Sequence, residues 1–210
     1  MIHSALTVVT APAETPVTVD EAKLHLRVDS DVTEDDGLIL AKIQAATAAA
    51  ERETGQAFIT RTLRASYDAF PYTSRSYLTH REAFIAAGGR QGIITLPSPP
   101  LQSVTSITYT DTAGASQTLS ASGYQVDTES RPGRIFPAYA SFWPTTRLET
   151  PNAVQITYLA GWGEPDDVPD EVKEAILLIL GQIYYSRGDS PVVVPDAAQW
   201  LLRGNWIGAM

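Results

Sequence analysis

The side chains of this sequence that could carry acid–base or metal chemistry are few and lie far apart. Its three histidines, His3, His25 and His80, are isolated, and none belongs to an HExxH pair or another metal-ligand spacing. Glu51 and Glu53 stand two residues apart, so on a helix they point to different faces and cannot act as a pair. The chain has no cysteine, which excludes thiolate metal sites, disulfides and cysteine nucleophiles. The sequence therefore predicts no catalytic residue, no metal site and no cofactor.

Motifs that bind phosphate or present a nucleophile are also missing. The chain has no Walker loop, no GxSxG and no GxGxxG after a strand, and Gly161-Trp162-Gly163 and Gly88-Gly89 are interpreted as turn glycines. One enzymatic alternative stays open, a hydrolase whose two carboxylates are brought together only by folding, as in a glycosidase.

The charge distribution argues against a protein that grips nucleic acid. The net charge is −9, and residues 1–60 carry four basic side chains against ten acidic ones. Contacts from Lys and Arg to phosphates supply most of the non-specific affinity for nucleic acid. We therefore expect that DNA, if it is involved, passes the protein without being bound tightly. No apolar run approaches the roughly 20 residues that span a bilayer, and no signal-like segment starts the chain, so we expect cytosolic synthesis and no membrane partner.

Two helices are predicted near the start of the chain. Thr18, with a glutamate three positions later, forms a capping box that begins a helix over 19–28. Thr33 is predicted to cap a longer helix over 34–54, with acids in its first turn and Gly55 placed to end it in a left-handed conformation.

The apolar residues of the long helices are candidates for subunit packing. On the second helix they follow the +4, +3, +4 spacing of one face: Ile39, Ile43, Ala46 and Ala50. A third helix is predicted over 169–187 with Pro169 as its first residue, and its run of five apolar residues includes Ile176 and Ile179. A helix that is apolar all round is buried all round, either in the core of its own chain or against a neighbouring subunit. Both interpretations are open.

Between the second and third helices, over residues 58–160, the hydrophobic period changes to two. Apolar residues alternate with polar ones in two runs, Leu63, Ala65, Tyr67 and Val154, Ile156, Tyr158. Shorter strands are predicted at 93–96, 104–109, 117–119 and 124–127. Close turn signals leave no room for crossover helices, so the sheet is antiparallel. The predicted fold class is α+β, a bundle of about three helices with a small antiparallel sheet domain between the second and third.

Two segments are predicted to be appendages. Residues 72–92 are rich in glycine and are interpreted as a loop or hairpin tip. Residues 189–210 are predicted to form a C-terminal docking arm, separate from a domain over 1–188, because two prolines bracket Val192–Val194 and disfavour continuation of the helix. Large apolar side chains in a terminal segment either bind a partner or fold back on the core of their own chain, and both interpretations are open at this point.

The order of several segments resembles the head-tail connector (adaptor) family of long-tailed phages and gene transfer agents. The similar stretches are VTVDEAKLHLRVD, DDGLILAKIQAATAAAERETGQAFITRTL, DAFP, LPSPPLQSVTSITYTD and ITYLAGWG followed by VPDEVKEAILLILGQIYYSRG. Together they cover roughly residues 16–203. Residues 72–92 look longer than the corresponding connection in relatives, so no family role is transferred to them.

The resemblance implies a non-enzymatic virion protein of the neck, made in the bacterial cytoplasm. Family members form a homo-oligomeric ring, typically a dodecamer, between the portal protein and a stopper or tail-terminator protein, and double-stranded DNA passes through the lumen. We hypothesise that the acidic side chains of residues 1–60 face the lumen. The C-terminal helix of the family inserts between portal subunits, and the residues that match this role by position are Trp200, Leu201, Leu202, Trp206 and Ile207.

A carbohydrate- or protein-binding β-rich module is the second alternative. It would use an aromatic platform made of Tyr139, Trp143, Tyr158 and Trp162.

Overall fold

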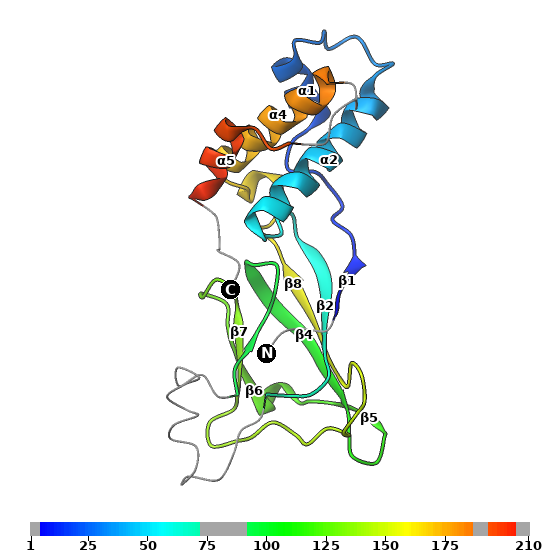
Figure 1. Ribbon diagram of the computed structural model, residues 1–210, viewed down its shortest axis with the longest axis vertical. Helices are drawn as coiled ribbons and strands as arrows, with labels where there is room; N and C mark the ends of the chain where they lie inside the picture. The colour runs from blue at the N-terminus through cyan, green and yellow to red at the C-terminus, as the bar shows by residue number, and fades with distance from the viewer. Residues whose placement is uncertain (1–4, 72–91, 187–192, 205–210) are drawn as a thin grey trace. The chain divides into compact units, whose positions relative to one another are not determined.

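The chain folds into two compact units (Figure 1). The structure, a computed structural model, describes residues 5–71, 92–186 and 193–204. One unit, here called the β unit, consists of Met1–Ala11 and Arg61–Ala160. The other, the helical unit, consists of Pro12–Thr60 and Gly161–Met210. Helices and an antiparallel sheet together confirm the predicted α+β class.

The β unit is built on a five-stranded antiparallel sheet. Its strands, in spatial order, are β1 (Ala5–Thr10), β2 (Arg61–Tyr67), β8 (Val154–Ala160), β4 (Leu101–Thr110) and β5 (Ser116–Thr118). In the middle of the sheet Ala65 pairs with Ile156, which pairs on its other side with Ile107, and all three are fully buried. The alternation of apolar and polar residues in the sequence therefore identifies the buried face of this sheet.

A second, three-stranded sheet lies against the first. It consists of β3 (Ile94–Thr95), β7 (Arg134–Pro137) and β6 (Tyr124–Asp127). The phenol of Tyr67 donates to the carbonyl oxygen of Thr95 at 3.0 Å, and the phenol of Tyr158 donates to that of Pro97 at 2.8 Å. Burial raises the pKa of both tyrosines above its usual range, so both remain donors.

Two strands were not predicted from the sequence. β1 precedes the first helix and adds an edge to the sheet, so the β unit is not confined to the segment between the second and third helices. β7 follows Pro132 and lies outside every strand predicted from the sequence. The other predicted strands are confirmed, with ends shifted by up to three residues.

The helical unit contains four α-helices among the residues that the structure describes. They are α1 (Val19–Leu26), α2 (Asp36–Thr54), α4 (Asp170–Tyr185) and α5 (Asp196–Arg203). The apolar faces of all four meet in one core cluster. A 3-10 turn over Pro165–Asp167 leads into α4. No helix in the described ranges is long and apolar enough to cross a membrane.

The observed ends of the helices agree only partly with the ends predicted from the sequence. The capping box at Thr18 is present, with both reciprocal hydrogen bonds to Glu21, and Gly55 ends α2 in the left-handed region with φ of 70°. The prediction that Thr33 caps the second helix is wrong, because α2 begins at Asp36 after a separate turn. Pro169 is the N-cap of α4 rather than its first residue, with φ of −55° and ψ of 139°.

The terminal helix was predicted to be separate from the core, and this is wrong for α5. Its residues Ala198 and Leu202 are buried in the same cluster as α2 and α4. The core of the same chain does not bury α4 on all sides, because Leu177 and Leu178 remain partly exposed, so of the two alternatives for this helix the fully intrachain one is wrong. The appendage predicted over 72–92 lies almost wholly outside the described residues, with only Gly92 inside them.

Candidate assembly surfaces

Among the residues that the structure describes, the groups that could have formed a catalytic centre do not come together. His25 lies on α1 with its ring near Gly181, while His3 and His80 fall outside the described residues. Within the part of the chain that the structure describes, no cluster of three or more His, Asp or Glu side chains could hold a metal ion. Glu51, half of the pair set aside from the sequence, accepts a hydrogen bond from the Phe58 amide at 2.9 Å and ends the turn after α2.

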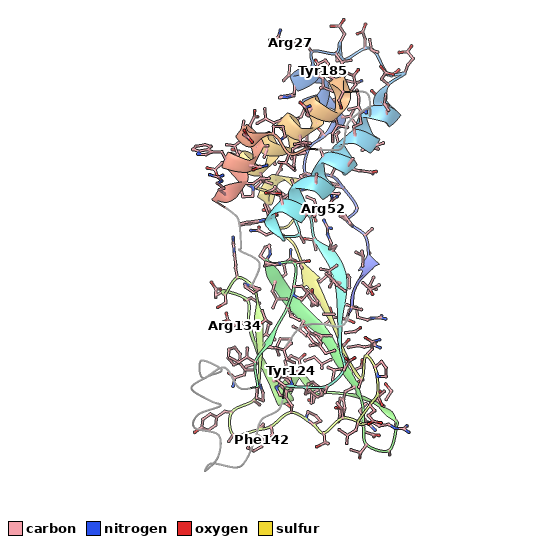
Figure 2. The ribbon with its side chains drawn as sticks, in the orientation of Figure 1. Arg27, Arg52, Tyr124, Arg134, Phe142 and Tyr185 are labelled. Carbon is pink, nitrogen blue, oxygen red and sulfur yellow. The ribbon has the colours of Figure 1, made fainter. Side chains whose placement is uncertain are left out.

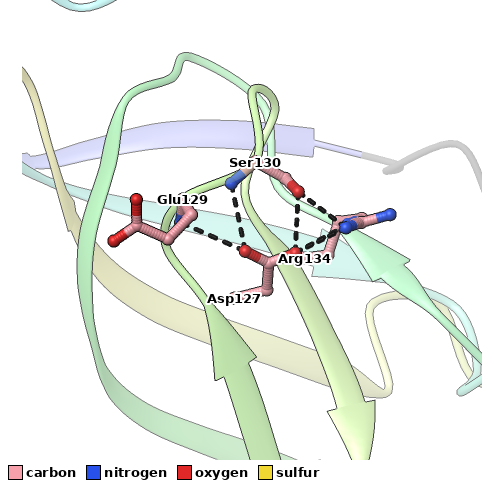
Figure 3. Close-up of polar contacts among 4 residues, drawn as sticks. All are labelled: Asp127, Glu129, Ser130 and Arg134. Carbon is pink, nitrogen blue, oxygen red and sulfur yellow. Dashed lines mark hydrogen bonds and ion pairs between the residues drawn. The ribbon is translucent and has the colours of Figure 1, made fainter.

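A polar cluster in the β unit fixes the hairpin between β6 and β7 (Figure 3). Asp127 accepts bonds from the amide of Ser130 at 3.0 Å and from its hydroxyl at 2.7 Å, and the guanidinium Nη2 of Arg134 lies 2.6 Å from the same carboxylate. The hydroxyl of Ser130 and the Arg134 guanidinium together lower the pKa of Asp127 to about 2. A carboxylate so stabilised is a poor proton donor, so this cluster is structural.

Two other carboxyl groups have a lowered pKa, and each serves a local turn. Bonds from the Thr18 backbone lower the pKa of Glu21 within the capping box. The Gln117 amide group and the backbone of Ala115 lower the pKa of Asp111, which closes the turn between β4 and β5. A glycosidase requires the reverse for its general acid, a raised pKa. These shifts therefore do not support the hydrolase alternative.

The aromatic platform of the second alternative is not formed. Trp143 is buried, stacks on Phe70 with ring centroids 5.0 Å apart, and donates its indole N–H to the Gly92 carbonyl oxygen. Tyr158 is fully buried, and Trp162 belongs to the other unit, where its indole donates to the Gln56 side chain at 3.2 Å. Tyr139 alone of the four is strongly exposed. These rings stabilise the fold instead of presenting a common face.

The six residues expected to pack between subunits form the core of one chain. None of them retains measurable exposure: Ile39, Ile43, Ala46, Ala50, Ile176 and Ile179. They belong to the single cluster that joins α2 and α4. A side chain with no exposed surface cannot contact a neighbour, so the intrachain interpretation that the sequence also allowed is the one the structure supports.

The opposite side of α2 is exposed and carries no charge over three turns. Ala41, Ala45 and Ala48 follow the +4, +3 spacing of one helical face, and all three are exposed. Leu38 and Leu40 flank them and are 50% and 40% exposed. A solvated helix face is normally polar or charged, so this surface, here called the α2 face, is unusual in a chain of net charge −9. The helical spacing in the sequence identified the side of α2 that contains Ile39 and Ile43 as the covered one and gave no role to this opposite side.

A second apolar surface lies between α1 and α4. Here a groove of about 330 Å³ is lined by Val17, Glu21, Leu24, His25, Lys173 and Leu177. Leu24 stands at its edge with 82% of its surface exposed. The two charged groups are of opposite sign and interact, because Lys173 contributes to the lowered pKa of Glu21. We call this surface the α1/α4 groove.

The C-terminal docking residues are divided between core and surface. Leu202 is 1% exposed, Leu201 is partly buried, and Trp200 is 70% exposed on the outer side of α5. Trp206 and Ile207 lie outside the described residues. The spacing of the residues explains this division, because Ala198 and Leu202 are four residues apart and share one face of α5, whereas Trp200, two residues from each, lies on the other face.

Further side chains hold the ends of the bundle in place (Figure 2). Tyr185, at the end of α4, donates its phenol to the Leu26 carbonyl oxygen at 3.1 Å, beside the left-handed residue Arg27 that ends α1. Lys42 of α2 donates to the Ile183 carbonyl oxygen at 3.4 Å. These bonds fix α1 and α2 on α4 and so fix the two apolar surfaces relative to each other within the helical unit.

Comparison with known proteins identifies the class. The family model of the phage gp6-like head-tail connector proteins matches residues 16–129, which is more than half of the chain. The chain belongs to this family, and its role is that of a structural connector. The resemblance indicated by the sequence is thereby confirmed. No curated protein sequence matches the chain.

Solved structures with the same fold extend over nearly the whole chain. A chain in the neck of an empty gene transfer agent particle, computed with C6 symmetry, is 25% identical, with a TM-score of 0.76 over 98% of this chain and 97% of that chain. A chain in the neck of a native particle, computed with C12 symmetry, is 26% identical, with a TM-score of 0.70 over 98% and 97%. A third, from a native gene transfer agent virion, is 24% identical at a TM-score of 0.74 over 98% and 96%, and shows the shared fold.

Proposed function

We propose that this protein joins the head of a tailed phage or gene transfer agent particle to its tail as a ring of identical subunits in the neck. The observation that carries the proposal is the likeness, over 98% of the chain, to chains in necks of cyclic symmetry, together with the family match.

The proposal places the portal protein on one side of the ring and a stopper or tail-terminator protein on the other. Docking to the portal is assigned to the C-terminal segment, with the exposed Trp200 as its anchor within α5. Trp206 and Ile207 are further anchors in this proposal. Leu202 supports the docking helix from inside the core instead of contacting the portal.

Double-stranded DNA passes through the lumen without sequence-specific binding in this proposal. The net charge of −9 supports it, because a basic wall would bind each phosphate and slow the passage of DNA. An acidic wall offers no such sites.

Deletion of the gene in a producing strain tests the connector role. We expect DNA-filled heads and free tails that fail to join, as seen by negative-stain microscopy, and restoration by the intact gene supplied in trans. Antibody labelling of wild-type particles should mark the neck. Normal joined particles in the deletion strain would contradict the proposal.

A further inference from the structure

Among the described residues of the helical unit, two apolar surfaces are exposed, the α2 face and the α1/α4 groove. The first is uncharged, and Leu38 and Leu40 lie exposed beside three exposed alanines. The second is concave, with Leu24 at its edge. They lie on different helices of one compact unit. Isolated surface leucines are common, but contiguous exposed apolar surfaces indicate contact with another protein.

We propose that the α2 face of one copy packs into the α1/α4 groove of the next copy. This rests on the proposed function, since a closed cyclic ring requires a heterologous interface in which each subunit offers two different surfaces. The two similar chains of known cyclic symmetry, C6 and C12, occur in assemblies of this kind.

The sizes of the side chains on the two surfaces match. The groove, at about 330 Å³, has room for a leucine side chain such as that of Leu38. In return Leu24, which projects from the edge of the groove, meets the alanines at 41, 45 and 48, whose short side chains let a neighbouring helix approach closely. Large side chains therefore face small ones in both directions.

The charges also allow this contact. The α2 face has no ionised group from residue 37 to residue 41 or from 43 to 50, so it buries no charge of its own. Glu21 and Lys173 at the groove already compensate each other, and Glu21 remains bonded to Thr18 in the capping box. Closing the groove thus leaves no unmatched charge, which would oppose association.

Disulfide trapping between two singly substituted copies tests the interface. The native chain has no cysteine, so each substitution introduces the only thiol. Copies carrying Ala45→Cys and copies carrying Leu24→Cys are produced together in particle-forming cells, and the purified particles are mildly oxidised. A disulfide requires Cα atoms within about 7 Å, so it reports direct contact.

We expect a mixed dimer that contains one copy of each variant, and no dimer when either variant is present alone. Gln182→Cys, at an exposed position of α4 that does not line the groove, serves as the matched partner control and should give no dimer with Ala45→Cys. A mixed dimer that forms equally with the control, or a dimer of Ala45→Cys alone, would overturn the proposed pairing.

A second variant separates interface from function. Ala45→Arg adds a bulky charge at an exposed position, so the chain should fold like the wild type, as judged by circular dichroism, yet be lost from particle necks; Ala45→Ser should be retained. If Ala45→Arg enters the neck normally, the interface is wrong and the connector role stands. If the wild-type chain is absent from necks, the proposed function itself fails.

Discussion

The ammonium group of Lys23 lies 2.5 Å from the carboxylate of Asp36, which joins α1 to the first residue of α2. The Lys23 side chain is 3% exposed, and its Nζ also donates to the Ser30 carbonyl oxygen at 3.4 Å. A buried lysine requires such partners, because an ionised group without them is costly to remove from water. The pair therefore fixes the loop between the two helices and the start of α2.

We expect Asp36→Asn to lower the free energy of unfolding by about 1–3 kcal/mol, below the range for fully buried pairs because Asp36 itself is partly exposed. Urea unfolding followed by circular dichroism measures the change. Asp35→Asn is the matched control, because the neighbouring Asp35 makes no side-chain capping bond, and it should change stability by no more than about 0.5 kcal/mol. Equal effects of the two substitutions would show that the Lys23 pair is not stabilising.

Gly161 has no space for a side chain, and we expect Gly161→Ala to destabilise the protein by at least about 2 kcal/mol. Its φ is +130°, and a Cβ would lie 2.7 Å from the backbone of Ile59 and Thr60. Gly37→Ala is the control, because Gly37 lies in α2 with nothing within 4 Å, and it should stabilise by roughly 0.5–1 kcal/mol. Thermal unfolding of both variants gives the comparison; a neutral Gly161→Ala would contradict the close approach.

The contribution of Asp127 to the stability of the hairpin between β6 and β7 should depend on pH. The pKa of Asp127 is about 2 in the folded chain, below the ordinary aspartate value of 3.8, so ionised Asp127 stabilises the fold above pH 3.8. This contribution is lost as the pH falls through about 2, where the carboxyl is protonated in both states. The stability difference between wild type and Asp127→Asn should therefore shrink between these pH values.

NMR titration of the Asp127 carboxyl carbon measures this directly. Ser130→Ala removes the largest cause of the lowered pKa and should move the midpoint upward. A midpoint that stays the same in Ser130→Ala would show that the hydroxyl bond at 2.7 Å does not hold the carboxylate.

The sequence predicted elements whose signals are local and missed those defined by long-range contacts. The capping box at Thr18 and the glycine end at Gly55 are local, and both are confirmed. The strand β1 has all six residues exposed and is defined by its pairing with β2, a partner more than fifty residues away, so no alternation marks it. Thr33 has the right residue type for a cap, but Asp36 is paired with Lys23 and the helix starts there.

The assembly surfaces show a similar limit. Helical spacing on α2 identified a face that must be covered, namely Ile39 and Ile43, but a period cannot tell a core from an interface. The family resemblance came from segments in order and did not depend on that choice, which explains why the class was predicted correctly while the packing residues were not.

The last prediction separates docking from folding within α5. Leu202 is 1% exposed in the helical core, so Leu202→Ala should cost about 2–5 kcal/mol of unfolding free energy. Trp200 is 70% exposed, so Trp200→Ala should leave stability within about 0.5 kcal/mol of the wild type. Removing everything after residue 188 should destabilise the helical unit, because Ala198 and Leu202 cover α4.

Trp200→Ala should abolish attachment to filled heads although it leaves the stability of the protein unchanged. An exposed aromatic anchor typically costs about 2 kcal/mol or more when it is cut to alanine in an interface, and a ring repeats the loss in every subunit. We therefore expect a stable Trp200→Ala protein that no longer sediments with purified DNA-filled heads, whereas Trp200→Phe, which keeps a large ring, should retain partial binding. If Trp200→Ala binds heads as well as the wild type does, portal docking does not depend on this face of α5, and the exposed tryptophan must serve another contact.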